Sequence, residues 1–564
     1  MPIHDPLLHA MQVQDMPPAD RDKVIQIFFT GSQRLGCPLL PERIFARFQD
    51  PDESQHPHPA LVNAMLLVGQ AFTGWTPGYS TAEKRHLPPT CPSAQVLLAK
   101  TQAYLNESLS RVDRMLDYLQ ASILLSYYFF QTGRLQEGSM ISSANSRMTV
   151  TCKLHLIDQA VLKEMLPGNE PAPGQSMWDN TLLGRPKDSY ELGVRIWTFW
   201  QSWYYDAVFS LIGGTPLTRD PVTPTTVFPR PSKTYETGLA LQLQNTSFKE
   251  LYENNPPQIP SPPNEPPGSS HPLSTYLKGL ALMERANQLL GKVNGRNLVG
   301  FAIGNATRAN AKRETCPFLL AGITLDDNEF SPETLHNLHA SVECLLKEHL
   351  PIRNSEMQST APLTKQDAAK IYCPLAERVV GHVFINTATI QLCRLSRALT
   401  GSFPVESEGR RQALRSIRTL ELNAAKGAVK AIRLFGDEVR RLDARMRGSA
   451  PNINTTVVQE VQEHPCLLLG FLLTSVCMVL VDNIQALKLA SSPPAESATE
   501  IASSEKDLRL CIATIEHTAS SFPLLAIQSK KIQDYQDRSN RAISSRQVPR
   551  WEFERRAALV DDMI

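Results

Sequence analysis

The sequence has few cysteines, and none of them forms a paired motif. Ten cysteines are scattered over 564 residues without a single CxxC pair. Disulfide frameworks and zinc knuckles need cysteines that are clustered or regularly spaced. We therefore expect reduced intracellular thiols and no zinc cluster within this chain.

Net charge is also nearly absent. The 57 Lys and Arg residues are balanced by 56 Asp and Glu residues, which leaves a formal charge of +1 at pH 7. A chain this close to neutral has no overall field for holding nucleic acid, so any such contact must be local or come from another segment. With 42% hydrophobic and 20% charged residues, the composition is that of a folded globular protein.

Long apolar runs are scarce. The longest candidate, Cys466 to Val481, has 16 residues, whereas roughly 18 to 20 residues are needed to span a bilayer. It predicts a buried core helix, and we expect no membrane contact. The first residues, MPIHDPLLHAMQVQD, contain no basic segment followed by an apolar core, so we also expect no secretory leader.

Catalytic signatures are missing as well. No GxSxG, HExxH or GxGxxG motif occurs in the sequence. Residues 326–330, DDNEF, resemble the aspartate-rich motif of all-α isoprenoid-type enzymes, but Phe330 stands where the last carboxylate is needed. We therefore expect no enzyme activity, and an isoprenoid-type enzyme is a remote alternative.

Two sets of histidines raise the question of a metal site. His336, His339 and Glu343 are spaced i, i+3 and i+7, which places them on one helix face, as a zinc or iron site would require. That face is the polar flank of an apolar stripe, which favours a solvated surface. His155 falls on an apolar face, which favours a hydrogen-bonded core histidine. We expect no metal and no cofactor in this chain.

Helical periodicity dominates the sequence and predicts an all-α fold. Residues 116–130 are apolar around nearly the whole helix circumference, so this helix should be central. After Gly133, the next predicted stripe is formed by Ile141, Ala144, Met148, Cys152 and His155. Two long helices are expected at 374–400 and 409–447, and a further one at 505–530. Together these patterns predict a multi-helix bundle in two packed halves.

Composition divides the chain into five parts. A tail of residues 1–21 precedes a helical domain over residues 22–225. Residues 226–273 are rich in proline, notably in the stretch NNPPQIPSPPNEPPGSSHP, and they predict a solvent-exposed linker. A helical extension over residues 274–547 and a tail over residues 548–564 complete the expected organisation.

Two regions in the second half are basic. Residues 410–447 hold 11 Lys and Arg against 4 acidic residues, a local +7, and residues 530–556 hold 8 against 4. Aromatic side chains for base stacking are nearly absent from the first region. The pattern therefore favours a charged outer helix face over a surface for phosphate or an import receptor.

A cluster of aromatic residues marks the end of the first half. Trp197, Trp200 and Trp203 lie within seven residues, next to Tyr204 and Tyr205. Such large side chains cover at least a third of a helix circumference. They predict a junction of helices in the core rather than a ligand pocket.

Four blocks of residues between positions 58 and 220 form a specific series. The first is HPALVNA, the second spans a predicted hairpin, the third follows that hairpin, and the fourth contains the tryptophans. Their motif residues are His58 and Pro59, then Gln120, Gly133 and Arg134, then Ala144, Arg147 and His155, then Glu191, Arg195, Trp197, Trp200, Asp206, Gly214 and Pro216. In this order the blocks resemble the regulatory middle-homology domain of fungal zinc-binuclear-cluster transcription factors.

The resemblance implies mainly structural roles for these motif residues. Trp197 and Trp200 are expected in the core, Glu191 and Arg195 as an ion pair on the helix surface, and Gly213 to Pro216 as the helix stop. Only Arg195 remains of the family's basic triplet. The resemblance also implies a regulatory and effector domain that acts in the nucleus and controls RNA polymerase II transcription.

The resemblance further implies what this chain would bind. The family's six-cysteine zinc cluster is not in this sequence, so DNA and zinc binding would belong to an amino-terminal segment lost from this gene model or never present. Expected partners are the transcription machinery or coregulators, a second chain in a homo- or heterodimer, and a small-molecule effector. The alternative is a helical interaction partner or corepressor-like protein without DNA binding.

Overall fold

The structure is a computed structural model in which helices account for all regular elements of the described residues. The described residues are 15–32, 37–74, 87–169, 171–172, 174–213, 217–218, 224–253, 272–293, 332–348, 365–400, 408–447, 467–489, 495–521 and 525–544. No strand occurs within these ranges, so the predicted all-α class is confirmed.

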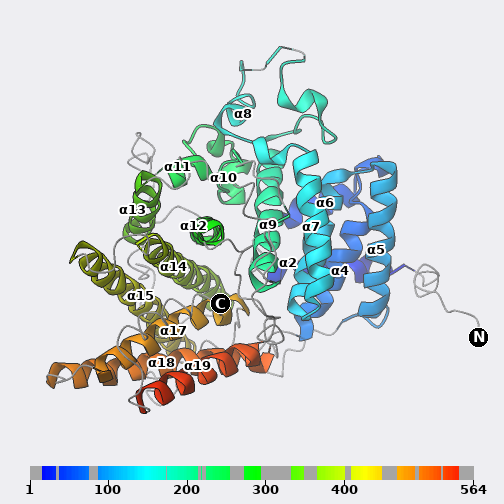
Figure 1. Cartoon of the computed structure of the whole chain (residues 1–564). Coiled ribbons are helices and arrows are strands. Elements are labelled where there is room, and N and C mark those ends of the chain that lie inside the picture. The colour runs from blue at the N-terminus through cyan, green and yellow to red at the C-terminus, as the bar shows by residue number, and fades with distance from the viewer. Residues whose placement is uncertain are drawn as a thin grey trace, which may run out of the picture. The chain divides into compact units, whose positions relative to one another are not determined.

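The chain divides into two compact helical units. The first unit contains the elements from α2 to α10, and the second contains the helices from α12 to α19. Figure 1 shows the helices of both units. The elements between residues 18 and 252 are α2 (Pro18–Ser32), α3 (Pro41–Phe48), η2 (Glu53–Gln55), α4 (Pro59–Gly74), α5 (Ala94–Arg111), α6 (Met115–Gln131), α7 (Leu135–Thr151), η4 (Leu154–Leu156), α8 (Gln159–Lys163), η5 (Met177–Asn180), α9 (Ser189–Gly213), α10 (Ser232–Glu236), η6 (Leu239–Leu241) and α11 (Phe248–Tyr252).

Helix α6 is the central helix of the first unit, as its sequence predicts. Thirteen of its 17 residues are buried, and it packs against α4, α5 and α7. Its C-terminus is a Schellman motif, in which the N–H of Arg134 donates to the carbonyl of Phe129 at 2.9 Å. Gly133 supplies the left-handed backbone that this motif needs, with φ of 73°. Gly133 therefore fixes the turn from α6 into α7.

The core face of α7 differs from the prediction. The buried residues are small and mostly polar, namely Gly138, Ser142, Asn145, Ser146 and Thr149. Of the predicted stripe, Cys152 is buried, Ala144 is exposed, and Ile141, Met148 and His155 are only half-buried. Within α7 itself, the predicted stripe is therefore not the core face. The neighbouring side chains are bulky, and a Cβ atom at Gly138 would lie 2.4 Å from the Phe209 ring. Small residues let α7 approach these rings, which the larger residues of the stripe would prevent.

The segment after α9 is not a solvent-exposed linker over its first part. Val227, Phe228, Tyr235 and Phe248 are all buried, and residues 217–249 belong to the first compact unit. The expectation that an exposed linker begins at residue 226 is therefore corrected for residues 226–249. Prolines in this part keep the chain extended, but its apolar side chains still pack. The proline-rich stretch 254–271 lies outside the described residues.

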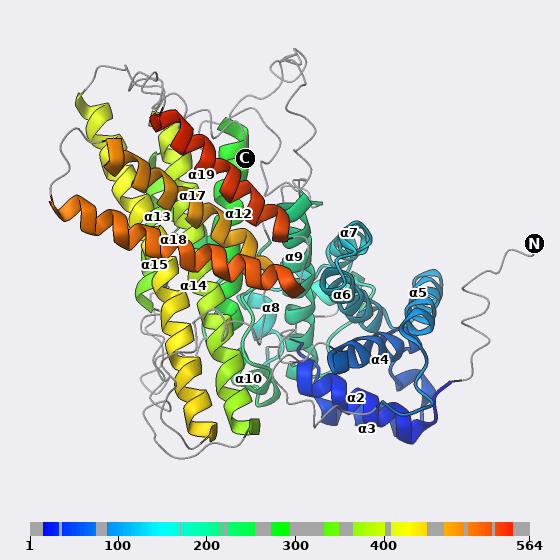
Figure 2. The same ribbon diagram turned by 90° about the horizontal axis from the view of Figure 1, so that it is seen from below.

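The second unit consists of long helices arranged around α14. Its helices are α12 (Pro272–Val293), α13 (Pro332–Glu348), α14 (Lys365–Thr400), α15 (Glu408–Arg447), α17 (Leu467–Leu489), α18 (Ala495–Ser521) and α19 (Ala526–Ser544). Figures 1 and 2 show α14 and α15 side by side, with α17 and α18 laid against them. The expected single helix at 505–530 is two helices, α18 and α19. Pro523 lies between them, where it would interrupt a continuous helix.

Helix α17 is the apolar helix predicted for the core. By length and composition alone, Leu469–Leu489 could cross a membrane, but 83% of its most apolar window is buried inside the protein. It packs against α14, α15, α18 and α19. A helix that is apolar around its whole circumference is typical of a core helix when its neighbours bury it. The burial of α17 by four helices therefore favours the role of a core helix.

Helix α15 is a core-facing helix with a charged outer face. Ala428, Ile432 and Phe435 of its predicted apolar stripe are buried. Two of its basic residues pair with acids of α18, the first being Lys426 with Glu500 at 3.1 Å. Arg433 pairs with Asp507 in the same way one heptad later. Part of the basic charge of residues 410–447 thus joins two helices of the second unit.

Candidate functional site

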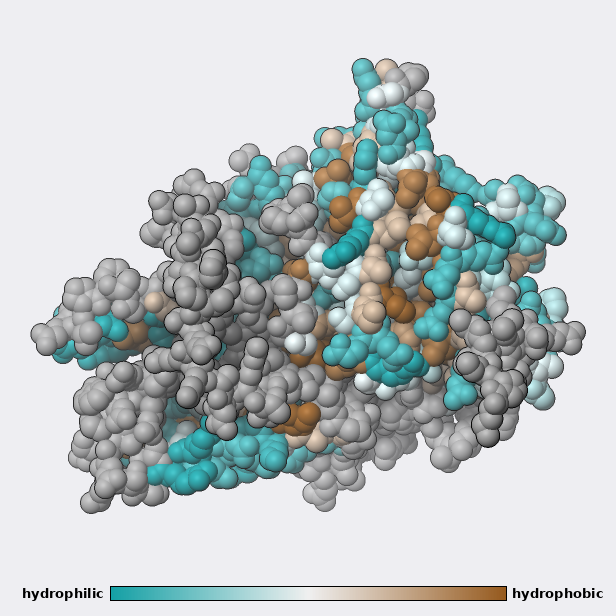
Figure 3. Space-filling view, turned by 45° about the vertical axis from the view of Figure 1, so that its right-hand side comes forward, coloured by the Kyte–Doolittle hydropathy of each residue, from teal (hydrophilic) through white to brown (hydrophobic). Residues whose placement is uncertain are grey.

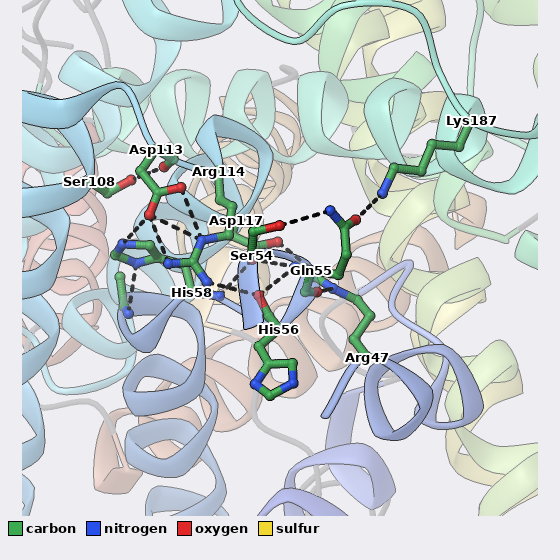
Figure 4. Close-up of polar contacts among 11 residues, drawn as sticks. Arg47, Ser54, Gln55, His56, His58, Ser108, Asp113, Arg114, Asp117 and Lys187 are labelled. Carbon is green, nitrogen blue, oxygen red and sulfur yellow. Dashed lines mark hydrogen bonds and ion pairs between the residues drawn. The ribbon is translucent and has the colours of Figure 1, made fainter. Parts of the chain in front are cut away.

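A buried carboxylate lies where four elements of the first unit meet (Figure 4). Asp117 is in the first turn of α6, and its side chain is only 5% exposed. One of its oxygens accepts a hydrogen bond of 2.7 Å from the backbone N–H of His58, directly before α4. Asp117 thereby ties the start of α6 to the start of α4.

Arg47 of α3 completes the pairing of this carboxylate. Its guanidinium group donates to both oxygens of Asp117, at 2.9 and 2.6 Å. It also donates to the carbonyls of Gln55 and His56, at 3.0 and 3.3 Å. A planar guanidinium suits such forked contacts better than an ammonium group does. The motif residue His58 is therefore embedded in a charged network that joins α3, η2, α4 and α6.

The imidazole of His58 caps helix α4. Its Nδ1 atom accepts a hydrogen bond of 3.1 Å from the backbone N–H of Ala60, and Pro59 occupies the first helical position. Burial and the neighbouring Arg114 lower the pKa of His58, while Asp113 and Asp117 oppose this. Because Nδ1 accepts, the neutral ring carries its proton on Nε2, which lies 3.5 Å from a carboxylate oxygen of Asp113. His58 and Pro59 thus act as the structural start of α4.

The turn between α5 and α6 holds the other side of this network. Val112 and Arg114 both have left-handed backbones, with φ of 52° and 43°. Such conformations are uncommon in residues with a side chain. The Arg114 guanidinium binds Asp113 at 2.7 Å and the carbonyl of His56 at 3.0 Å, which fixes the turn.

Arg195 forms a second buried charged site, on α9. Its guanidinium group donates to the carbonyls of Gly184 and Leu183, at 2.6 and 3.1 Å, and to Glu191, at 3.2 Å. It also lies 4.8 Å from the ring centre of Trp178. The expected ion pair with Glu191 is present. The expectation of a surface pair is wrong for Arg195, because this residue is only 1% exposed. The loop before α9 folds over the guanidinium group and satisfies its donors.

The tryptophans of α9 bind the segment that follows the helix. The indole N–H of Trp200 donates to the carbonyl of Val227 at 2.6 Å, and that of Trp197 donates to the carbonyl of Arg230 at 2.9 Å. The Trp200 ring stacks on Phe228, with 4.3 Å between ring centres. Both tryptophans are buried, as predicted. Their role is to dock residues 226–230 against α9.

Gly193 and Val194 stand where the family has the first two residues of its basic triplet, and the structure explains the glycine. A Cβ atom at this position would lie 2.3 Å from the Tyr235 ring. Tyr235 belongs to α10 and is 1% exposed. A basic side chain at position 193 would displace this tyrosine. The loss of the basic triplet therefore accompanies the docking of the segment around α10.

The remaining motif residues lie in several places. Gln120 is buried in α6, and Arg134 stacks on Phe129 and pairs with Glu137. Ala144 and Arg147 are exposed on α7. Asp206 is buried and lies 2.9 Å from the hydroxyl of Thr218. Gly214 and Pro216 lie outside the described residues, as do residues 326–330 of the aspartate-rich motif.

The histidine patterns have mixed outcomes. His155 is half-buried, and its backbone carbonyl accepts a hydrogen bond of 2.9 Å from the N–H of Thr225. On α13, His336 and Glu343 are exposed, whereas His339 lies 3.4 Å from the hydroxyl of Ser396. Within the described ranges, no group of three His, Cys, Asp or Glu side chains is placed to hold a metal ion. The charged clusters therefore have geometry suited to holding helix ends and loops together.

Sequence reasoning missed several residues that build these sites. Arg47, Trp178 and Tyr235 lie outside the motif blocks, and they contact Asp117, Arg195 and Gly193, respectively. Only the apolar or charged character of each residue is visible in the sequence. Its partner depends on how the helices pack.

Comparison with known families identifies the region that contains both sites. Residues 25–239 match the sequence model of a family described as the fungal specific transcription factor domain. This part of the chain is a fungal transcription factor middle-homology region. The matched region ends within η6, so it includes the segment that docks on Trp200. No curated protein and no solved structure matches the chain.

The middle-homology region corresponds closely to the first compact unit. Its match begins within α2 and includes the Asp117 and Arg195 sites. The family is a family of transcription-regulatory domains, not of enzymes. The buried motif residues of this region therefore maintain the shape of a regulatory domain.

Proposed function

We propose that the chain is the regulatory and effector part of a factor that controls RNA polymerase II transcription in the nucleus. The observation that carries this proposal is the match of residues 25–239 to the fungal specific transcription factor domain. Its support from the structure is that the motif residues His58, Arg195 and Trp200 are buried and hold the first unit together. Contacts to DNA and zinc would then come from a separate segment or from a partner chain.

The proposed partners are coregulators of transcription and a small-molecule effector. A regulatory domain can couple such a ligand to output by shifting the balance between two packings of its helices. The near-neutral charge of +1 agrees with recognition of proteins or small molecules rather than nucleic acid.

A fusion experiment tests this function. Residues 1–564 are joined to a foreign DNA-binding domain, and the output of a reporter that carries its binding site is measured. We expect a several-fold change, in either direction, relative to the DNA-binding domain alone. Nuclear accumulation of the unfused chain is followed by microscopy. A well-expressed fusion that leaves the reporter unchanged would count against the proposal.

Matched variants make the reporter result specific to the folded domain. Arg195→Met removes a buried guanidinium group from the first unit, so it should abolish the change in output. Arg411→Met is the control, because the Arg411 side chain is 58% exposed and pairs only loosely with Glu408, at 3.7 Å. An equal loss in both variants would show that the output does not depend on the integrity of the first unit.

A further inference from the structure

Helix α7 turns a polar face toward the core of the first unit, which reverses the usual arrangement of an amphipathic helix. Met140 is 72% exposed, whereas Ser142 and Asn145 are each 1% exposed. Figure 3 shows that apolar side chains also occur on the outer surface of the protein in this view. Burying a hydroxyl or amide group costs free energy unless the group forms hydrogen bonds. The partners of these buried polar groups therefore need a physical account.

Two contacts fix how α7 lies along α9 (Figure 1). Near the start of α7, a Cβ atom at Gly138 would lie 2.4 Å from the ring of Phe209, near the end of α9. Directly after α7, burial raises the pKa of the Cys152 thiol to about 11, and the nearby guanidinium group of Arg195 opposes this rise. Since Arg195 is close to the start of α9, the two helices are antiparallel.

Asn145 and Ser202 lie opposite one another at the middle of this contact. Asn145 comes two helical turns after Gly138, and Ser202 comes two turns before Phe209. Ser142 is one turn before Asn145 on the same side of α7. All three polar side chains are 1% exposed. Three buried polar groups from two helices thus gather in the interior of the first unit.

One oxygen atom of each of these side chains has no hydrogen-bond partner within the described part of the chain. These atoms are Oγ of Ser142, Oδ1 of Asn145 and Oγ of Ser202. Further along the two helices, the hydroxyls of Thr149 and Thr198 donate to carbonyls of their own helices, at 2.7 and 2.8 Å. Buried polar groups in folded proteins are nearly always bonded to protein or to ordered water. The three oxygens therefore point to a bound molecule that can bond to all of them.

We propose that Ser142, Asn145 and Ser202 bind an ordered water molecule between α7 and α9. A buried water forms about three hydrogen bonds to groups that the protein leaves unsatisfied. The amide oxygen of Asn145 only accepts, whereas each serine hydroxyl both donates and accepts. The water can therefore donate to Asn145 and to one serine, and accept from the other serine.

The chemistry of the site favours water over an ion or a larger ligand. All three side chains are uncharged, so they provide no opposite charge for an ion. The close approach of Gly138 to Phe209 and to Phe129 holds α7 near both neighbouring helices, which leaves little space for a larger molecule. A bound water would join α7 to α9 where their own side chains do not bond. This inference does not rest on the proposed role in transcription.

Hydrogen exchange of the α7 and α9 peptides in the full chain tests the site. If water is bound, Ser202→Ala removes one of its partners, so exchange should become about three- to tenfold faster. If no molecule is bound, the same change removes an unsatisfied hydroxyl, so exchange should be slower or unchanged. Ser32→Ala is the matched control. Ser32 is also buried, but its hydroxyl donates to the carbonyl of Phe29 at 3.0 Å on α2, so exchange in α7 and α9 should not change.

Oxygen-17 magnetic relaxation dispersion of the full chain measures the water directly, because it counts water molecules with long residence times. The natural chain is expected to hold at least one more such water than the double variant Ser142→Ala/Ser202→Ala. The Ser32→Ala variant should hold as many as the natural chain. Equal numbers in the natural chain and the double variant overturn the proposal. So does slower or unchanged exchange in Ser202→Ala, because the hydroxyl then has no partner to lose.

Discussion

The guanidinium group of Arg47 and the carboxylate of Asp117 form a bidentate ion pair between α3 and α6, with N···O distances of 2.9 and 2.6 Å. The same carboxylate accepts the N–H of His58 at 2.7 Å. The chain before α4 and helix α3 thus meet α6, about 60 to 70 residues away, at one charge. Because Asp117 is nearly buried, its partners must satisfy it fully.

Replacement of Asp117 should therefore destabilise the first unit. Asp117→Asn keeps the size of the side chain but leaves Arg47 without its charged partner. We expect a loss of about 3 kcal/mol in the free energy of unfolding, measured by urea denaturation. Asp22→Asn is the control, because Asp22 pairs with Arg21 at a partly exposed position, and it should cost less than about 1 kcal/mol. Equal losses in the two variants would contradict a special role for the Asp117 site.

The contrast between Pro59 and Asp117 shows how far the sequence can predict this site. Pro59 signals a helix start by itself, because its fixed φ and missing N–H suit the first helical position, and α4 does begin there. Asp117 gives no comparable signal. Its partner Arg47 is 70 residues away, and any of many arginines could pair with it on sequence grounds.

The Arg195 site makes a second prediction, on the difference between arginine and lysine. Arg195→Lys keeps the charge but cannot reach Glu191, Leu183 and Gly184 at the same time. We expect it to cost about 2 to 3 kcal/mol, measured by urea denaturation. Glu191→Gln should cost less, because the Glu191 side chain is 21% exposed and the two carbonyl acceptors remain. A larger effect of Glu191→Gln would show that the ion pair, not the fork of hydrogen bonds, dominates the site.

Gly193 and Tyr235 allow a test by a double-mutant cycle. Gly193→Ala brings a Cβ atom to 2.3 Å from the Tyr235 ring, so it should destabilise the protein by about 1 to 3 kcal/mol. In a Tyr235→Ala background the same change should cost much less, because the clashing ring is gone. Gly409→Ala is the control, since no atom lies within 4 Å of the added Cβ. Additive effects of the two changes would contradict the contact.

The same segment explains why the linker prediction failed. Prolines around residues 221–231 argue against helices and strands, and that inference holds for residues 224–230. Yet Val227 and Phe228, which lie between Pro224 and Pro229, are buried, and Trp200 of α9 offers an apolar surface on which Phe228 stacks. Proline content predicts an irregular backbone, but it does not predict exposure. Similarly, the spacing of Ile141 and Ala144 gives the period of α7 but not which face meets the bulky rings of α6 and α9.

Asp482 of α17 predicts how the stability of the second unit depends on pH. Its carboxylate accepts a hydrogen bond of 2.5 Å from the hydroxyl of Tyr535 on α19. Burial is the main reason that the pKa of Asp482 rises from 3.8 to about 6, with a contribution from Glu421. The folded state therefore favours the protonated form of Asp482. The contribution of this protonated carboxyl to the stability of the second unit is complete below pH 3.8 and is lost as the pH rises through about 6. The difference corresponds to about 3 kcal/mol between acidic and neutral pH.

Asp482→Asn, which cannot ionise, should remove that dependence, so its stability relative to the natural chain should increase from pH 4.5 to pH 7. Hydrogen exchange of the α17 and α19 peptides during urea titration measures it, and Asp537→Asn on the exposed face of α19 is the control. A constant difference between the Asp482→Asn variant and the natural chain over this range would contradict a folded-state pKa of about 6 for Asp482.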